Sequence, residues 1–263
     1  MRIKIVAIIL ACQLTMSAQV HAQNNRINTS NTIGWYNYFG TVKLNNKVGI
    51  HTEYQWRRDN LITDRQQGLL RVGINYALTP KVLLRAGYAW IETYAYGDIP
   101  LNGLGRDFTE HRTFQMLQLS QKEGIIDLSH RFMLEQRFVG RYSSATQTKE
   151  DEYPFSNRLR YMVRAQIPLK AKEIKDNIPY LAVYDEVFIG FGKNVNANIF
   201  DQNRLGILLG YRFNKNVRLE GGYLNQTLQY GRQINGRNVF QNNNGFIVNA
   251  NFNIDLTKRG AKK

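Results

Sequence analysis

The sequence contains a single cysteine, Cys12, among its 263 residues. A disulfide bond needs two cysteines, so no cross-link within this chain can stabilise its fold, even in an oxidising compartment. Long apolar runs are scarce too. Beyond the first 22 residues, none approaches the roughly 18 apolar residues of a transmembrane helix. The sequence therefore excludes a disulfide-rich scaffold and predicts no membrane-spanning helix after its N-terminal segment.

Histidine is almost as scarce, and its placement limits the chemistry that the chain can perform. Three of the four histidines, His51, His111 and His130, lie beyond residue 22 on separate segments. With no thiol nearby, this spacing matches no metal site, and we expect neither a metal nor a cofactor. None of the three is followed two positions later by serine, so no serine triad can assemble locally. His51 and Glu53 have the spacing of a base with its orienting carboxylate, or of two members of an ion-pair network.

The arginines are not concentrated in one patch, although the chain is basic overall. Lysine and arginine number 35 against 20 aspartates and glutamates, which gives a formal charge of +15. Nucleic-acid binding favours a concentrated basic patch, whereas these arginines are spread through the chain at about one per strand-like segment. We therefore expect no nucleic-acid partner.

The first 22 residues have the pattern of a secretory signal peptide. Arg2 and Lys4 form a short basic region, an apolar stretch follows, and Val20-His21-Ala22 fits a cleavage site. The residues before Cys12 faintly resemble a lipoprotein processing site, which is the alternative. We expect residues 1–22 to be removed, which leaves 23–263 as a single domain with a short basic C-terminal tail.

Alternation of apolar and polar residues runs through the rest of the chain. The clearest example is the segment 246–256, FIVNANFNIDL, in which apolar residues occupy every second position. Such alternation predicts strands, because successive side chains of a strand point to opposite faces. The predicted strands are about 10 to 13 residues long, roughly twice the usual globular length and close to that of a tilted strand crossing a bilayer.

The connections between these segments alternate in length. Short ones are predicted at 45–46, 79–81, 121–124 and 214–216, and longer polar ones at 58–65, 96–109, 139–155, 192–200 and 231–243. Short turns at one end and long loops at the other are typical of transmembrane β-barrels. The sequence therefore predicts an all-β fold, an antiparallel up-and-down transmembrane β-barrel of 10–12 strands.

Three details of this barrel are further expectations. Eleven strands can be counted, whereas single-chain bacterial barrels usually have an even number, so 24–32 is a candidate twelfth strand or one weak segment is misread. Gly221 and Gly222 are interpreted as a bulge that exchanges the faces of their strand. Aromatic residues near strand ends, among them Trp56, Trp90 and Tyr230, fit interfacial girdles. The alternative fold, a soluble β-sandwich or barrel, usually has shorter strands.

One face of most predicted strands carries arginine, and we assign this face to the barrel lumen. The forked guanidinium suits pairing with carboxylates. The predicted lumen charge cluster consists of Glu53, Arg57, Arg71, Arg85, Arg131, Glu135, Arg137, Arg158, Arg160, Arg164, Glu186 and Arg204. Two interpretations remain open. The cluster is an ion-pair network that stiffens the wall, or it is an anion-binding or anion-selective lumen, since arginines outnumber carboxylates.

Several strand motifs resemble a known family. They are YQWRRDN at 54–60, LLRVG at 69–73, NRLRY at 157–161, YDEVF at 184–188 and NRLG at 203–206. Together with the signal peptide and a first strand that contains Trp35, they make the chain similar to domain-of-unknown-function family 2490. The resemblance covers essentially the whole mature chain. It implies an outer-membrane β-barrel of a Gram-negative bacterium, and it supplies no catalytic residues.

These features predict an integral protein of the outer membrane, exported by its signal peptide. We expect a non-enzymatic role, as a structural or binding barrel or as a narrow, porin-like, anion-preferring pore. The alternative is an enzyme that modifies outer-membrane lipids, of the acyl hydrolase or acyltransferase type. Expected partners are outer-membrane lipids, including lipopolysaccharide, and the barrel assembly machinery.

Overall fold

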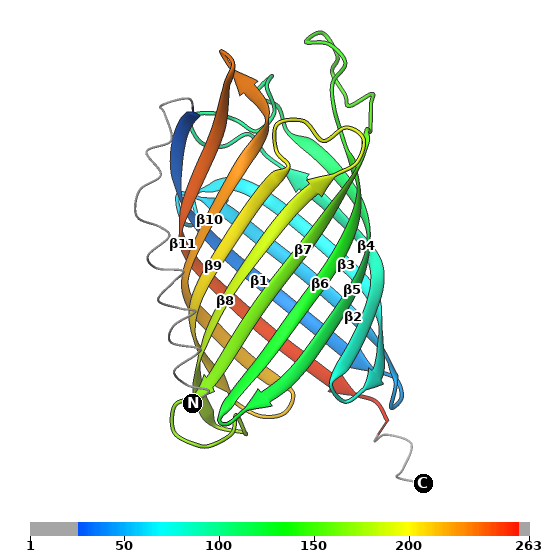
Figure 1. Cartoon of the computed structure of the whole chain (residues 1–263), viewed down its shortest axis with the longest axis vertical. Helices are drawn as coiled ribbons and strands as arrows, with labels where there is room; N and C mark the ends of the chain where they lie inside the picture. Colours follow the sequence, from blue (N-terminus) through cyan, green and yellow to red (C-terminus); the bar gives the residue numbers. More distant parts are fainter. Residues whose placement is uncertain (1–25, 258–263) are drawn as a thin grey trace, which may run out of the picture.

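The computed structural model describes residues 26–257, which form eleven β-strands closed into one barrel (Figure 1). The strands are β1 (Arg26–Lys43), β2 (Val48–Asp59), β3 (Asp64–Thr79), β4 (Val82–Thr93), β5 (Phe108–Glu123), β6 (Ile126–Val139), β7 (Phe155–Pro168), β8 (Ile178–Phe191), β9 (Phe200–Arg212), β10 (Val217–Ile234) and β11 (Arg237–Asp255). The predicted signal peptide, Cys12 and most of the basic tail lie outside the described residues. Within residues 26–257, no helix is long and apolar enough to cross a membrane.

Each strand pairs antiparallel with the next one in sequence, and the barrel closes between β1 and β11, which run parallel. The closing register runs from Arg26 opposite Asn238 to Lys43 opposite Asp255. Strand direction alternates along the chain, so the first and last strands of an odd-numbered barrel point the same way. The count of eleven strands is therefore confirmed, whereas the expectations of an even number and of purely antiparallel pairing are wrong. Residues 26–32 begin β1 and form no twelfth strand.

The two ends of the barrel differ in their connections (Figure 1). Strands are joined at the lower end through 44–47, 80–81, 124–125, 169–177 and 213–216, and at the upper end through 60–63, 94–107, 140–154, 192–199 and 235–236. The long loop predicted at 231–243 is wrong, because β10 and β11 continue to a two-residue turn. Asn235 and Gly236 have φ angles of 51° and 71°, which suits a tight hairpin turn whose two central residues are both left-handed.

The outer and inner faces of the sheet have opposite character. Every strand contributes large apolar side chains to the outside, and Ile74, Leu209 and Ile254 are all more than half exposed. The inside holds most of the buried arginines and glutamates. Of the predicted girdle residues, Trp56 is 38% exposed on the outside, but Tyr230 is 2% exposed and packs inside, so that assignment is wrong.

Above Gly222, apolar and polar residues exchange faces on β10 although the pairing with β11 stays regular up to Gln229 and shifts only between Gln229 and Gln233. Gly221 and Gly222 pair regularly with both neighbouring strands, so the predicted bulge is wrong. Leu224 is fully buried inside the barrel, whereas Asn225 faces outward and donates to Asn244 Oδ1 at 2.8 Å. The change of sequence pattern therefore marks the upper edge of the apolar outer surface rather than a distortion of the strand.

Glycines on the inner face of β9 make room for tyrosines of β8. A Cβ atom at Gly206 would lie 2.2 Å from the ring of Tyr184, and one at Gly210 would lie 2.3 Å from the ring of Tyr180. Both tyrosines thereby pack into an apolar cluster inside the barrel that also contains Trp35. Close packing of this kind leaves no space for even one added methyl group.

Candidate functional site

The twelve residues of the predicted lumen charge cluster all lie inside the barrel, where they fall into three groups. Eight belong to one continuous ion-pair network, namely Glu53, Arg71, Arg131, Glu135, Arg137, Arg158, Arg160 and Glu186. Arg164 forms a separate pair with Glu220. Arg57, Arg85 and Arg204 form no ion pair with a carboxylate of residues 26–257. Arginines that are paired with carboxylates and arginines that are not thus look alike in the sequence, and the structure separates them.

Glu135 on β6 is the centre of this network and is completely buried. Its two carboxylate oxygens accept hydrogen bonds from Arg158 at 2.6 Å and from Arg160 at 2.7 Å. Arg71 and Arg112 approach the same carboxylate at 3.6 and 3.8 Å. A buried charge is tolerated when it is both paired and hydrogen-bonded, and Glu135 meets both conditions.

The network extends from Glu135 toward the upper end of the barrel. Glu110 on β5 contacts Arg112 and Arg137 at 2.5 Å each. Asp201 on β9 joins Arg158, at 2.7 Å, to Arg137, at 3.4 Å. These contacts connect four strands across the interior.

Other members extend the network toward the lower end. Glu53 on β2 pairs with Arg71 of the neighbouring strand at 2.9 Å. Glu186 on β8 accepts from Arg160 and from Arg131, each at 2.8 Å. In total the network joins six arginines to five carboxylates, and we call these eleven residues the central network.

Sequence reasoning missed three members of the central network, and two of them belong to β5. Glu110 and Arg112 share the inner face of this strand with Phe114 and Met116, which are also buried. Because charged and apolar residues follow each other on one face, the strand shows no clear polar side. The available signal was the two-residue spacing of Glu110 and Arg112, which places both on the same face of a strand.

Asp201 is the third missed member, and no alternation could have found it. The register between β8 and β9 shifts at this point, because Gln202 pairs with Phe188 but Phe200 pairs with Ile189. Asp201 is the extra residue of this irregularity. An inserted residue interrupts the two-residue alternation, so the alternation does not predict on which face its side chain lies.

Two aromatic rings fill the space beside the central network. The guanidinium carbons of Arg57 and Arg204 lie 3.9 and 4.8 Å from the centre of the Trp35 ring. Those of Arg160 and Arg204 lie 4.5 and 4.6 Å from the centre of the Phe188 ring. Such contacts contribute most where water is excluded. The network and these rings form a packed layer across the middle of the barrel.

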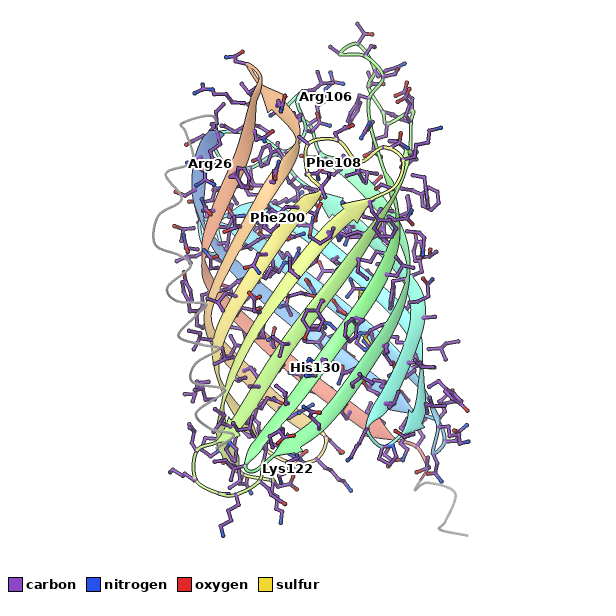
Figure 2. The ribbon with its side chains drawn as sticks, viewed as in Figure 1. Arg26, Arg106, Phe108, Lys122, His130 and Phe200 are labelled. Carbon is purple, nitrogen blue, oxygen red and sulfur yellow. The ribbon has the colours of Figure 1, made fainter. Side chains whose placement is uncertain are left out.

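A cavity lies on either side of this layer. The upper cavity, of about 710 Å³, is lined by residues of the upper halves of the strands and by upper loops, among them Phe108 and Tyr142. The lower cavity, of about 670 Å³, extends to Lys122. Phe108 and Lys122 mark the two ends of the barrel in Figure 2. Because Arg204 lines both cavities, it belongs to the boundary between them.

The loop 94–107 crosses the mouth of the upper cavity. It starts from β4 and reaches the far side of the barrel, where Tyr230 donates to the carbonyl of Ile99 at 2.6 Å. Arg232 donates to the carbonyl of Pro100 at 2.8 Å. Leu101, on the same loop, lines the cavity. The loop thus narrows the opening while leaving the cavity beneath it.

The chemistry available to His51 is limited by its surroundings. Its Nε2 lies 3.2 Å from Glu53 Oε2, but that carboxylate is also bound by Arg71. Among the described residues, no serine or threonine hydroxyl bonds to His51, so the pair has no adjacent nucleophile. In the same part of the chain, no group of three or more histidine, cysteine, aspartate or glutamate side chains is placed to hold a metal ion.

Comparison with known proteins identifies the family. No curated protein matches the chain. The model of the family described as "Protein of unknown function (DUF2490)" matches residues 32–237, a range that contains the whole central network together with Arg57, Arg85 and Arg204. As this match covers well over half of the sequence, the chain, a closed β-barrel, belongs to the DUF2490 family.

Proposed function

We propose that the protein is an integral outer-membrane β-barrel of a Gram-negative bacterium, with a non-enzymatic role as a structural or binding barrel. The observation that carries the proposal is the pair of opposite faces around the closed sheet. Large apolar side chains are exposed on the outside of every strand, whereas charged residues are buried within. Soluble proteins rarely expose an apolar surface of this extent, and a lipid-facing barrel needs one.

Polar side chains on the outer face are few and are paired with each other. Gln115 and Gln136 exchange two hydrogen bonds, at 3.2 and 3.0 Å. Asp185 accepts from Asn203 at 2.8 Å. His130, on the lower part of the wall in Figure 2, lies 2.8 Å from a tyrosine hydroxyl of the neighbouring strand. Pairing lowers the cost of placing these groups in an apolar environment, so they are compatible with the proposal.

The packed central layer supports a binding or structural role rather than an open pore. Glu135, Arg158 and Arg160 are all at most 5% exposed, so little water reaches the middle of the barrel. An ion would have to displace several charge-assisted hydrogen bonds to pass. We therefore expect purified protein in planar bilayers to conduct far less than an open porin.

Heat-modifiability in isolated outer membranes tests the proposal. The full chain would be expressed with its own N-terminal segment, and the membranes would be run on SDS gels with and without boiling. We expect the protein in the outer-membrane fraction, with a mobility that changes on boiling. A protein recovered in the soluble periplasmic fraction, with one mobility under both conditions, would overturn the proposal.

A matched pair of substitutions tests the lipid-facing surface directly. Ile74 on β3 and Ile199 in an upper loop are 63% and 64% exposed. Ile74→Arg should cost about 2–4 kcal/mol and reduce assembly, because it places a charge among lipid chains, whereas Ile199→Arg should be nearly neutral. Equal, small effects of the two substitutions on the yield of heat-modifiable barrel would mean that both positions face water.

A further inference from the structure

The floor of the upper cavity contains two buried arginines that form no ion pair with a carboxylate of residues 26–257. Arg57 on β2 is 6% exposed and Arg204 on β9 is 9% exposed, and both line the cavity. They come from different sides of the barrel and share Trp35 as a neighbour. Both guanidinium groups therefore lie beside the Trp35 ring, and neither is paired with an acid.

The hydrogen bonds of these two arginines go to neutral groups. Arg57 donates from Nε to Gln55 Oε1 at 2.9 Å and from Nη1 to Gln67. Arg204 donates from Nε to Gln202 Oε1 at 3.1 Å, and its side chain forms no other hydrogen bond within residues 26–257. Side-chain amides satisfy donors, but they do not neutralise a positive charge.

A buried charge without a partner is costly, and the central network avoids it. In the central network every arginine reaches at least one carboxylate. Removing a charge from water costs several kcal/mol unless an opposite charge and hydrogen bonds compensate. The ring of Trp35 offsets part of this cost for Arg57 and Arg204. Glu186, opposite Arg204 on β8, bonds to Arg160 and Arg131 instead. An anion from outside the chain can therefore supply direct pairing that the chain does not.

We infer that the upper cavity binds a small organic anion whose carboxylate or phosphate head is held by Arg57 and Arg204. This inference deepens the proposed role as a binding barrel, because it names the site and the class of ligand. Guanidinium groups recognise both carboxylate and phosphate through paired N–H donors. The shared chemistry is an oxyanion that supplies the missing negative charge.

The upper part of the cavity suits the rest of such a molecule. Its walls include Phe108, Leu101, Leu228 and Tyr230, so apolar and aromatic surface lies above the two arginines. Ligand sites commonly combine apolar walls with a few placed polar groups, and about 710 Å³ lies within their usual size range. An anion with an aromatic or aliphatic body fits this arrangement better than an inorganic ion does.

Trp35 provides a direct reporter for the test. The chain has three tryptophans, and Trp56 and Trp90 lie on the outer face, 38% and 40% exposed. In a barrel carrying Trp56→Phe and Trp90→Phe, the fluorescence comes from Trp35 alone. The barrel, extracted from membranes in detergent, would be titrated with benzoate, with phenylphosphate and with the neutral molecule benzyl alcohol. We expect a saturable fluorescence change with one or both anions and none with the alcohol.

Arginine variants show whether the response arises at the proposed site. Arg57→Gln and Arg204→Gln should each weaken anion binding by about tenfold or more, the usual loss when a charged hydrogen bond is removed. The matched control is Arg85→Gln. Arg85 also faces the interior and bonds only to an amide, Asn75, at 2.6 Å, but it lines the lower cavity. Its substitution should leave binding unchanged.

Stability measured on the same variants separates binding from a structural role. Arg57→Gln removes an uncompensated buried charge, so we expect a thermal stability equal to or higher than that of the parent barrel. The inference is overturned if no anion gives a saturable change, if benzyl alcohol matches the anions, or if Arg57→Gln and Arg85→Gln bind equally well. A heat-modifiable band from the same preparation would show that such a failure concerns the cavity and not the proposed outer-membrane barrel.

Discussion

The central network and the floor of the upper cavity are made from the same residue type with opposite surroundings. In the network, arginines share carboxylates, and Glu135 alone is reached by four of them. At the floor of the cavity, Arg57 and Arg204 meet amides and aromatic rings instead. The partner, and not the arginine itself, therefore determines whether the side chain stabilises the barrel wall or leaves positive charge available for a ligand.

The largest effect should come from removing the centre of the network. Glu135→Gln leaves its arginines buried without their shared negative charge, and breaking a buried pair typically costs about 3–5 kcal/mol. We expect a sharp fall in the urea concentration at which the compact, unboiled gel band disappears. A midpoint unchanged from that of the parent protein would contradict a stabilising role of the network.

Two arginine substitutions should change the stability of the barrel in different directions. Arg158→Gln breaks bonds to Glu135 and Asp201 and should lose about 2–3 kcal/mol. Arg204→Gln removes a charge that has no carboxylate partner and should leave stability unchanged or raised. Thermal unfolding in detergent, followed by circular dichroism, measures both. An equal loss of stability in the two variants would mean that the central network and the floor of the upper cavity do not differ in this respect.

The packing of glycine against tyrosine should matter less than the network. Gly206→Ala places a methyl group against the ring of Tyr184, and overpacking of this kind typically costs about 1–3 kcal/mol. Gly68→Ala is the control, because a Cβ atom there meets nothing within 4 Å. The same unfolding measurement applies, and we expect the control to match the parent protein or to exceed it slightly.

The smallest effect is expected at the lower end, outside the barrel interior. Glu173, in the turn 169–177, contacts Lys122 at 2.9 Å, and both side chains are well exposed. Hydrogen bonds from Lys122 and Lys175 hold the pKa of Glu173 below its usual value. The pair therefore acts above the ordinary glutamate pKa and is lost as the pH falls through the lowered one. Since exposed pairs contribute little, Glu173→Gln should not change the unfolding midpoint at pH 7, and a measurable loss there would show a stronger coupling.

The strands were predictable because the two-residue period is visible in a single sequence. The segment 246–256 shows it without interruption, and the same pattern led to the correct count of eleven. The closing pair was not predictable, because contacts between the two ends of a chain leave no local signal. The tight turn between β10 and β11 was missed for another reason. Asn235-Gly236 is a strong turn signal, but the many asparagines around it conceal the strands on both sides.

The candidate site was predictable in part, for a related reason. Alternation indicates which arginines share a face, but partners across the lumen depend on the stagger and tilt of the closed barrel. Asp201 and Arg158 are 43 positions apart and still lie in contact. Nothing local distinguishes Arg57 from Arg71, which lie on neighbouring strands. One is left without a carboxylate, whereas the other is paired with Glu53.

If the barrel spans the outer membrane as proposed, the parallel pairing of β1 with β11 places Arg26 and Asp255 on opposite sides of that membrane. β1 begins at the upper end with Arg26, and β11 ends at the lower end with Asp255 (Figure 1). In an even-numbered barrel both ends would emerge on the same side. Here, a tag introduced just before Arg26 and another after Asp255 would be separated by the full height of the barrel. An impermeant antibody applied to intact cells would therefore detect one of the two tags and never both.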